Sequence, residues 1–285
     1  MAHPGFTLPS VVIPAFNAPG ELDGCLQSVY ETVPAGTEIV VIDDASTDPA
    51  TADVLARWRR RAGEGWRFLA NPRNLGFVAT ANRGLRETPS DVVLLNADTE
   101  VLQGWLEGLA RCLATHPAIA TATPWTNNGE IASMPRFCAA NPPPDRAALE
   151  AAWPRAIAQC GPPLYPDIPT AVGFCMAIAR RAIDRVGLFD EALFGRGYGE
   201  ENDFCMRAQA AGLRNVLCDD VYVTHLGGRS FGPLGLKPDE HSMQRLLSRH
   251  PDYLDQVQAF IAADPLAPRR QAIIDALNRA GCSLG

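Results

Sequence analysis

The chain has 285 residues, of which 47% are hydrophobic, and its formal net charge is −7. This length suits one large α/β domain with or without a helical appendage, and the apolar content is sufficient for a sizeable core. The negative charge argues against broad binding to nucleic acid, and no stretch reaches the roughly 20 apolar residues that a membrane-spanning helix needs.

The eight cysteines are scattered and include no Cys-x-x-Cys pair, which argues against a zinc site. Most lie within apolar patterns, so we expect reduced cysteines in the core of a cytosolic protein. The first residues lack the basic and apolar regions of a secretory signal, which favours the same compartment.

Short apolar runs alternate with helical patterns through the first half of the chain. A helix is indicated, for example, where apolar residues recur at positions i, i+3, i+4 and i+7 from Leu22. Apolar strands separated by helices predict a mostly parallel sheet with helices on both faces, in which ligands bind beyond the carboxyl ends of the strands. The predicted strands are 8–13, 38–42, 66–70, 92–95 and 119–123, and the predicted helices are 21–29, 48–61, 78–86 and 102–115.

The second half of the chain is less regular. Proline-rich segments at 141–144 and 161–163 bracket a helical piece, 146–158. We interpret this piece as a loop insertion near the place where an acceptor substrate would bind. After Lys237 the pattern is helical to the end, with breaks at Pro251 and Pro265. The other predicted elements are strands at 170–179, 216–217 and 221–224 and helices at 181–186 and 201–211.

Polar residues follow the predicted strand 92–95 directly. Asn96 and Asp98 should lie on the same side, because side chains of an extended chain alternate with a period of two. Such an oxygen pair can hold Mg²⁺ or Mn²⁺ together with a diphosphate, although acids are also common in ordinary turns.

The predicted strand 38–42 also ends in two carboxylates, Asp43 and Asp44. We expect Asp44 to contact a nucleoside and Asp48 to cap the following helix. The alternative is that Asp43 and Asp44 only accept hydrogen bonds from turn amides. The loop that contains Asn74 and Gly76 precedes another helix, and its amides suit a polar or anionic ligand.

A glycine-rich loop at 195–199 leads into the acidic residues Glu200, Glu201 and Asp203. The positive end of a helix favours ionised carboxylates, and a carboxylate in a cleft can accept a proton from an attacking hydroxyl. The alternative, which stays open, is simple helix capping by these acids.

His225 follows the last predicted strand and precedes a glycine pair, Gly227 and Gly228. Imidazole is a common metal ligand, so we expect His225 to complete the metal site. The other histidines have no comparable setting and are expected at the surface or at helix ends; they are His3, His116, His241 and His250.

In this order, the segments described above resemble the family-2 glycosyltransferases of the GT-A fold, from about Leu8 to about Phe231. The ordered set is more specific than any single motif, and its strongest parts are 199–208 and 225–228. Within the family the chain is most similar to the rhamnosyltransferase-like branch that builds bacterial surface polysaccharides.

The resemblance implies a metal-dependent hexosyl- or deoxyhexosyltransferase that uses Mn²⁺ or Mg²⁺. Asp98 matches the last acid of the Asp-x-Asp metal motif, where Asn96 departs from the first acid, and His225 matches a further metal ligand of some members. Glu201 stands where the family often has the aspartate that serves as catalytic base. Because glutamate is longer than aspartate, Glu200 and Asp203 remain alternatives for this role. The residues expected to bind the nucleotide sugar are Pro14, Phe16, Asn17, Asp44, Asn74, Gly76, Asn96 and Asp98.

The implied reaction is an inverting transfer from a UDP-, dTDP- or GDP-sugar to a saccharide, lipid-linked or protein acceptor. The implied architecture is a GT-A domain over 1–231, with a nucleotide-binding half at 1–125 and an acceptor half at 126–231, followed by a helical extension at 232–285. We expect a cytoplasmic location, with peripheral contact to the inner face of the membrane or to a partner protein.

Three other functions fit the sequence less well. A nicotinamide oxidoreductase needs a glycine-rich turn after the first strand, and here that turn is 14–17, without glycine. A sugar-phosphate nucleotidyltransferase would likewise need a glycine-rich phosphate loop there. An inactive GT-A domain that binds a sugar nucleotide or a partner would be expected to lose its carboxylates, yet Asp44, Asp98, Glu201 and Asp203 are present.

Overall fold

The computed structural model describes residues 7–227 and 240–284. His3, Gly228 and the predicted domain boundary at 231/232 therefore lie outside the described residues. The strands are β1 (Ser10–Ala15), β2 (Ile39–Asp43), β3 (Trp66–Ala70), β4 (Val92–Leu95), β5 (Thr99–Val101), β6 (Ile119–Trp125), β7 (Cys175–Ile178) and β8 (Arg214–His225).

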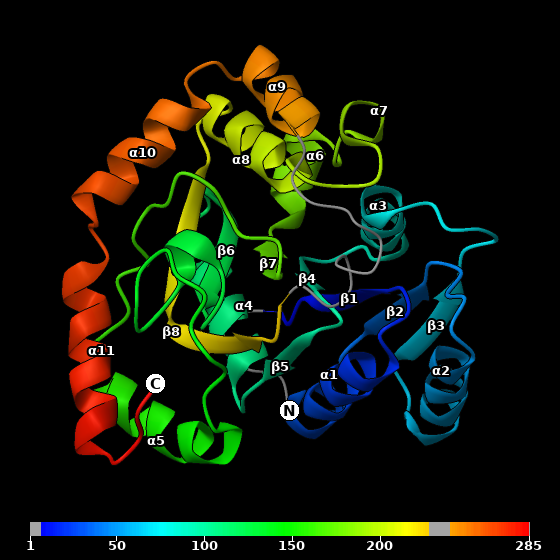
Figure 1. The fold of residues 1–285 in the computed structure, drawn as a ribbon, viewed down its shortest axis with the longest axis horizontal. Coiled ribbons are helices and arrows are strands. Elements are labelled where there is room, and N and C mark those ends of the chain that lie inside the picture. Colours follow the sequence, from blue (N-terminus) through cyan, green and yellow to red (C-terminus); the bar gives the residue numbers. More distant parts are fainter. Residues whose placement is uncertain (1–6, 228–239, 285) are drawn as a thin grey trace.

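Helices surround the sheet on both faces (Figure 1). Those of the first half are α1 (Pro19–Thr32), α2 (Pro49–Arg61), α3 (Phe77–Glu87) and α4 (Trp105–Thr115), and a 3₁₀ turn, η1, spans Glu130–Ala132. Those of the second half are α5 (Arg146–Gln159), α6 (Arg180–Val186), α7 (Glu191–Phe194), α8 (Glu200–Ala210), α9 (Glu240–Arg249), α10 (Tyr253–Ala263) and α11 (Ala267–Arg279).

The eight strands form a sheet in the order β3-β2-β1-β4-β7-β6-β8-β5. The predicted mostly parallel sheet is correct for β3-β2-β1-β4 and for β6-β8, but β7 runs antiparallel to both of its neighbours and β5 runs antiparallel to β8. The sheet is therefore mixed. Strand direction depends on the path of the connecting segments, which the apolar pattern of a strand does not record.

The strand ends converge on one edge of the sheet. Leu95, the last residue of β4, pairs with Cys175, the first residue of the antiparallel β7. β6 and β8 run parallel to each other, so Trp125 and His225 end near the same place. Segments from four strands can thus contribute side chains to one site beyond the carboxyl end of β4.

Most predicted elements occur within a few residues of their expected positions, but β8 differs. The sequence predicts two short strands, 216–217 and 221–224, whereas the structure has one long strand that continues through Asp219 and Asp220. Asp219 is fully buried and accepts hydrogen bonds from the backbone amides of Leu164 and Tyr165, and it pairs with Arg269 of α11. Tertiary partners therefore make a charged residue compatible with a buried strand.

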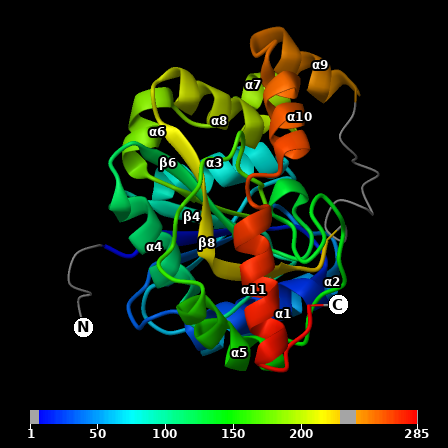
Figure 2. The same cartoon turned by 90° about the vertical axis from the view of Figure 1, so that its left-hand side faces the viewer.

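The predicted helical piece at 146–158 is confirmed as α5, but it is packed on the domain and is not a loop insertion. It lies beside α11 in both views (Figures 1 and 2), and the two helices share a second hydrophobic core with β6 and β8. Leu149 and Ile273 are fully buried in this core, and the indole of Trp153 donates a hydrogen bond to the carbonyl of Asp220. The C-terminal helices therefore pack on the body of the domain.

The three predicted C-terminal helices are confirmed, with breaks around Pro251 and Pro265. The expectation of core cysteines is confirmed for six of the eight; Cys138 is exposed, Cys160 is intermediate and all eight are free thiols. Among residues 7–227 and 240–284, no helix combines the length and hydrophobicity needed to cross a membrane.

The packing of α3 on β1 leads to a stability prediction. A Cβ atom at Gly84 would lie 2.2 Å from Cγ1 of the buried Val12. Gly84→Ala should therefore lower the free energy of unfolding by about 1–3 kcal/mol through overpacking, despite the better helix propensity of alanine.

Gly24 is the matched control, because it also lies in a helix interior but its Cβ would meet only Oε1 of Glu100 at 3.6 Å. Gly24→Ala should leave stability unchanged or raise it by up to about 1 kcal/mol. Urea denaturation measures both, and equal effects of the two substitutions would contradict the close approach of α3 to β1.

Candidate functional site

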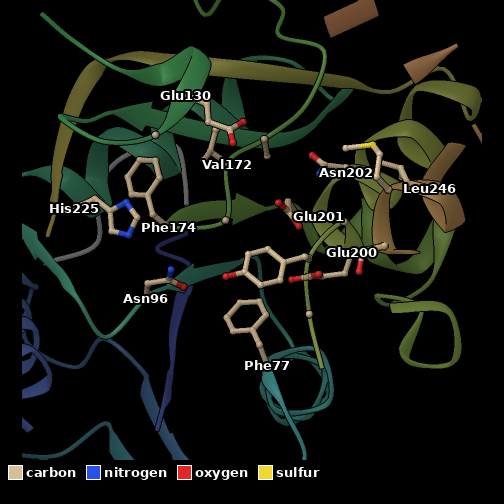
Figure 3. A pocket seen from close by; sticks show the side chains of 18 of the residues that line it. Phe77, Asn96, Glu130, Val172, Phe174, Glu200, Glu201, Asn202, His225 and Leu246 are labelled. Atoms are coloured by element: carbon tan, nitrogen blue, oxygen red, sulfur yellow. The ribbon is translucent and has the colours of Figure 1, made fainter. Parts of the chain in front are cut away.

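A cavity of about 590 Å³ opens at the sheet edge where β4, β6, β7 and β8 meet. Figure 3 shows His225, Phe174 and Asn96 on one side of it and Glu200 and Glu201 on the other. Its lining residues are Phe77, Asn96, Asp98, Asn128–Glu130, Ala171–Phe174, Gly197–Asn202, His225, Ser242, Met243, Leu246 and Tyr253.

Asp98 is one of the residues that line this cavity. Only 3% of the residue is exposed, and its Oδ1 atom has no hydrogen-bond partner among the described residues. Asn96 also lines the cavity, and its backbone amide donates a hydrogen bond to the carbonyl of Phe174. A buried carboxylate oxygen without a donor is costly unless it binds a cation or a proton.

His225 is next to Asp98 because β5 pairs with the end of β8. Thr99 is in register with His225, and the amide of Leu226 donates to the carbonyl of Asp98. Nε2 of His225 lies 3.5 Å from Oδ1 of Asp98, while Nδ1 lies 2.6 Å from the carbonyl oxygen of Asn128. A carbonyl can only accept, so Nδ1 carries a proton and Nε2 is directed toward Asp98.

The Asp98–His225 pair suits a divalent cation. Burial disfavours the charged imidazole, but the adjacent Asp98 carboxylate outweighs this and raises the pKa of His225, and a metal between the two would replace that proton. No group of three or more His, Cys, Asp and Glu side chains forms a closed metal site within 7–227 and 240–284. The two groups, with the amide oxygen of Asn96, form an open set that a ligand such as a diphosphate can complete.

Glu200 and Glu201 enter the cavity from the first turn of α8. Gly199 precedes them with φ +101°, and a Cβ there would meet the ring of Phe194 at 2.9 Å, so only glycine fits this turn. Glu200 is 4% exposed, and its Oε2 atom has no hydrogen-bond partner among the described residues. Burial, followed by the charge of Glu201, raises the pKa of Glu200 well above its usual range.

Glu201 is less buried than Glu200 and also lines the cavity. Burial, with a contribution from the nearby Glu130, raises the pKa of Glu201 to about 7. Glu130 was not singled out from the sequence; it lies in η1 with φ +48°, and Figure 3 shows its side chain beside Val172. A strained backbone at a cavity-lining residue is a signal that only the structure reveals.

Asp203, the third acidic candidate, does not line the cavity. It is fully buried, and its carboxylate accepts from Arg207 at 2.8 Å, His250 at 2.9 Å and Arg249 at 3.0 Å. Although burial acts in the opposite direction, these partners lower the pKa of Asp203. A carboxylate with three donors is a poor base, so Asp203 has a structural role, and His250 is its partner as well as a helix-terminal residue.

Asp44 has a different environment from the predicted nucleoside contact. It is 5% exposed, and its two carboxylate oxygens accept from Nδ2 of Asn71 and from the amides of Leu75 and Gly76, at 2.7–2.8 Å. The residue organises the 71–76 loop. The neighbouring Asp43 is more exposed at the end of β2 and accepts from the amide of Ser46 through Oδ1.

The remaining residues predicted to bind the nucleotide sugar lie near the ends of β1 and β3 and do not line the cavity. Asn17 joins two loops, because its side-chain oxygen accepts from the amides of Thr47 and Asp48. Asn74 accepts a hydrogen bond from Arg196, and Pro14 and Phe16 are partly exposed at the end of β1. Asn96 and Asp98 are the members of the predicted set that reach the cavity.

A family model described as glycosyl transferase family 2 matches residues 10–187. The uncharacterized protein MT1568 of Mycobacterium tuberculosis is 33% identical over 110 residues, which are 38% of this chain and 33% of that protein. The match thus spans about a third of the length of this curated relative.

Solved structures of low sequence identity share the fold. GalNAc-T7 with UDP, GalNAc and Mn²⁺ has a TM-score of 0.67 at 17% identity, over 99% of this chain and 55% of that one. The mannosyltransferase PcManGT from Pyrobaculum calidifontis, with GDP-Man and Mn²⁺, has a TM-score of 0.56 at 18% identity, over 95% and 72%. S. aureus TarS 1-349 has a TM-score of 0.57 at 17% identity, over 96% and 81%. These similarities confirm the GT-A fold.

The pKa of Glu201 leads to a pH-dependent stability prediction. The folded-state pKa of about 7 exceeds the ordinary 4.5, so between these values the unfolded state binds fewer protons and stability falls as pH rises. Glu201→Gln removes this ionisation. The variant should unfold with a free energy about 1–3 kcal/mol higher than the parent at pH 8, and about equal to it at pH 4.5.

Urea denaturation in the presence of a chelator, at pH 4.5 and pH 8, measures this difference. Glu87 provides the control, because it is solvent-exposed and forms an ion pair with Arg67 at the surface. Glu87→Gln should not raise the free energy of unfolding more at pH 8 than at pH 4.5. A Glu201→Gln effect that is independent of pH would show that Glu201 ionises normally in the folded protein.

Proposed function

The chain belongs to glycosyl transferase family 2, and we propose that it transfers a sugar from a nucleoside-diphosphate sugar to an acceptor hydroxyl with inversion of the anomeric configuration. The observation that carries this proposal is the arrangement in one cavity of Asp98 and His225, suited to a metal, together with Glu201, suited to accept a proton. The cavity joins residues of the nucleotide-binding half, 1–125, to residues of the acceptor half, 126–231.

We assign the metal position to Asp98, His225 and the side-chain oxygen of Asn96. The free Oδ1 of Asp98 and the Nε2 of His225 face each other, and the carbonyl of Asn128 holds the imidazole in the required tautomer. A bound Mn²⁺ or Mg²⁺ would neutralise the diphosphate and stabilise the negative charge that develops on it. With asparagine in place of an acid at 96, the protein offers less negative charge to the cation.

Glu201 is the proposed general base. The attacking hydroxyl gives its proton to the Glu201 carboxylate, its oxygen bonds to the anomeric carbon, and the bond between that carbon and the diphosphate oxygen breaks with its electron pair. A pKa near 7 allows Glu201 to be ionised at neutral pH and still accept a proton effectively. Glu200 is buried and its pKa is raised by that burial, so in its protonated form it is suited to donate a hydrogen bond to a sugar hydroxyl.

The nucleoside is proposed to lie beyond the ends of β1 and β2. Asp43 replaces Asp44 as the proposed acidic contact, because the carboxylate of Asp44 already accepts three hydrogen bonds within the protein. Phe16 and Pro14, partly exposed at the end of β1, would border the base. The donor classes that we consider are UDP-, dTDP- and GDP-sugars, with a deoxyhexosyl transfer in polysaccharide synthesis as the specific hypothesis.

A thermal-shift screen of UDP, GDP, dTDP and CDP, each with and without Mn²⁺, tests donor binding. A ligand that binds only the folded state raises the melting temperature, and we expect one nucleotide to do so mainly with metal. Asp98→Ala should abolish the metal-dependent part, whereas Asp43→Asn should weaken nucleotide binding with or without metal. No shift with any nucleotide at millimolar ligand and metal would contradict the proposal.

Turnover by Glu201→Gln tests the base. Loss of a positioned general base should lower kcat by about 10²–10⁴-fold with little change in nucleotide affinity, because the amide keeps the shape of the side chain but cannot take the proton. Hydrolysis or transfer of the matching donor, measured by nucleotide release with Mn²⁺, gives kcat. Parent-like turnover would exclude Glu201 as the base, and nucleotide binding without turnover in the parent protein would favour an inactive GT-A binding domain.

A further inference from the structure

The C-terminal helices form part of the cavity wall. Ser242, Met243 and Leu246 of α9 and Tyr253 of α10 line the cavity opposite the residues of β4 and β8. Leu246 and Tyr253 are buried, whereas Met243 is 37% exposed. Figure 3 shows Leu246 beside Asn202, in the first turn of the helix that carries Glu200 and Glu201.

Two consecutive residues at the end of α9, Arg249 and His250, connect this part of the cavity wall to α8. Arg249 donates from Nη1 to Oδ1 of Asp203 at 3.0 Å and from Nη2 to Oδ2 of Asp190 at 2.8 Å. His250 contributes Nε2, 2.9 Å from the same Oδ1 of Asp203. One guanidinium therefore joins α9 to both α8 and the start of α7, and the imidazole reinforces the contact to α8.

The contact is made where it can influence catalysis. Asp203 lies in the first turn of α8, two residues after Glu201, and its backbone amide donates to the carbonyl of Gly199. The other oxygen of Asp203 is bound to Arg207, which also donates to the carbonyls of Val186 and Leu188. Because Asp203 is fully buried and held on both oxygens, the direction of this turn depends on its partners.

We propose that Arg249 and His250 are positioning residues for the glycosyl transfer: by binding Asp203 they hold the α9–α10 wall against the first turn of α8, and so fix Glu201 relative to the acceptor. This inference rests on the proposed function for its catalytic consequence. The proposed metal position at His225 lies across the cavity from Glu201, and the proposed nucleoside position lies beyond the ends of β1 and β2. We therefore expect nucleotide and metal binding to change little when this contact is broken.

Substitutions at His250 separate positioning from bulk packing. Glutamine can place an N–H donor close to the position of Nε2, whereas leucine fills similar space without a donor. His250→Leu should lower kcat and raise the acceptor KM, so that kcat/KM for the acceptor falls about 10–100-fold, since small misplacements of a catalytic group have effects of this size. His250→Gln should recover most of this loss.

Arg249→Ala should act in the same direction and more strongly, because it breaks the contacts to both Asp203 and Asp190. Arg86→Ala is the matched control: Arg86 also pairs with an acid of α7, Glu191, at 3.0 Å, but that pair is exposed and does not involve Asp203. The control should keep kcat and acceptor KM within about twofold, as expected for loss of a surface ion pair.

Two further readouts distinguish the outcomes. The affinity for nucleotide and Mn²⁺ should change by less than about threefold in His250→Leu, and amide hydrogen exchange should become faster in both α9 and the first turn of α8, but not in the Arg86→Ala control. Parent-like kinetics in His250→Leu, or equal loss in His250→Leu and His250→Gln, would overturn the proposal. A loss of nucleotide affinity in His250→Leu as large as its loss of kcat/KM would show general destabilisation instead, and it would also overturn the proposal.

Failure of the proposed function has a different signature. If the unsubstituted protein neither binds nor turns over any nucleotide sugar, the glycosyl-transfer proposal fails for every variant alike, and the catalytic role proposed for Arg249 and His250 falls with it. If the unsubstituted protein is active and the His250 variants have the same kcat and acceptor KM as it does, only the positioning inference fails.

Discussion

A carboxylate that leaves water must gain hydrogen-bond donors, bind a cation or take up a proton, and the candidate site is organised by this constraint. Asp44 and Asp203 are saturated with donors and organise the chain around them. Asp98 keeps one oxygen without a donor next to His225, while Glu200 and Glu201 have raised pKa values. The same type of side chain is thus satisfied by hydrogen-bond donors at some positions and left available for a cation or a proton at others.

The geometry of the mixed sheet brings these groups together. Because β7 runs antiparallel between β4 and β6, the segment before β7 meets the carboxyl ends of its neighbours at one edge. The short β5 then pairs with the end of β8 and places Asp98 beside His225. A wholly parallel sheet would have left the start of β7 at the opposite edge, far from the cavity.

The family match covers only part of the cavity lining. The match ends at residue 187, whereas α8, the end of β8 and the C-terminal helices all lie beyond it and supply much of the cavity wall. Loops and appended helices that surround a rigid sheet are where related enzymes acquire distinct substrates. The ion pairs between Arg249 and the acids of α7 and α8 tie this region to the common core.

The sequence by itself determined the α/β alternation, the C-terminal helices and the GT-A resemblance, because apolar periodicity and proline breaks are local properties. It also located Asn96, Asp98, Glu200, Glu201 and His225, which all line the cavity. Tertiary structure alone decided the direction of β7, the continuity of β8 through the buried Asp219, and the saturation of Asp44 and Asp203. The buried carboxylates depend on donors far away in the chain, such as Arg269 for Asp219 and His250 for Asp203. A local sequence pattern contains no record of such partners.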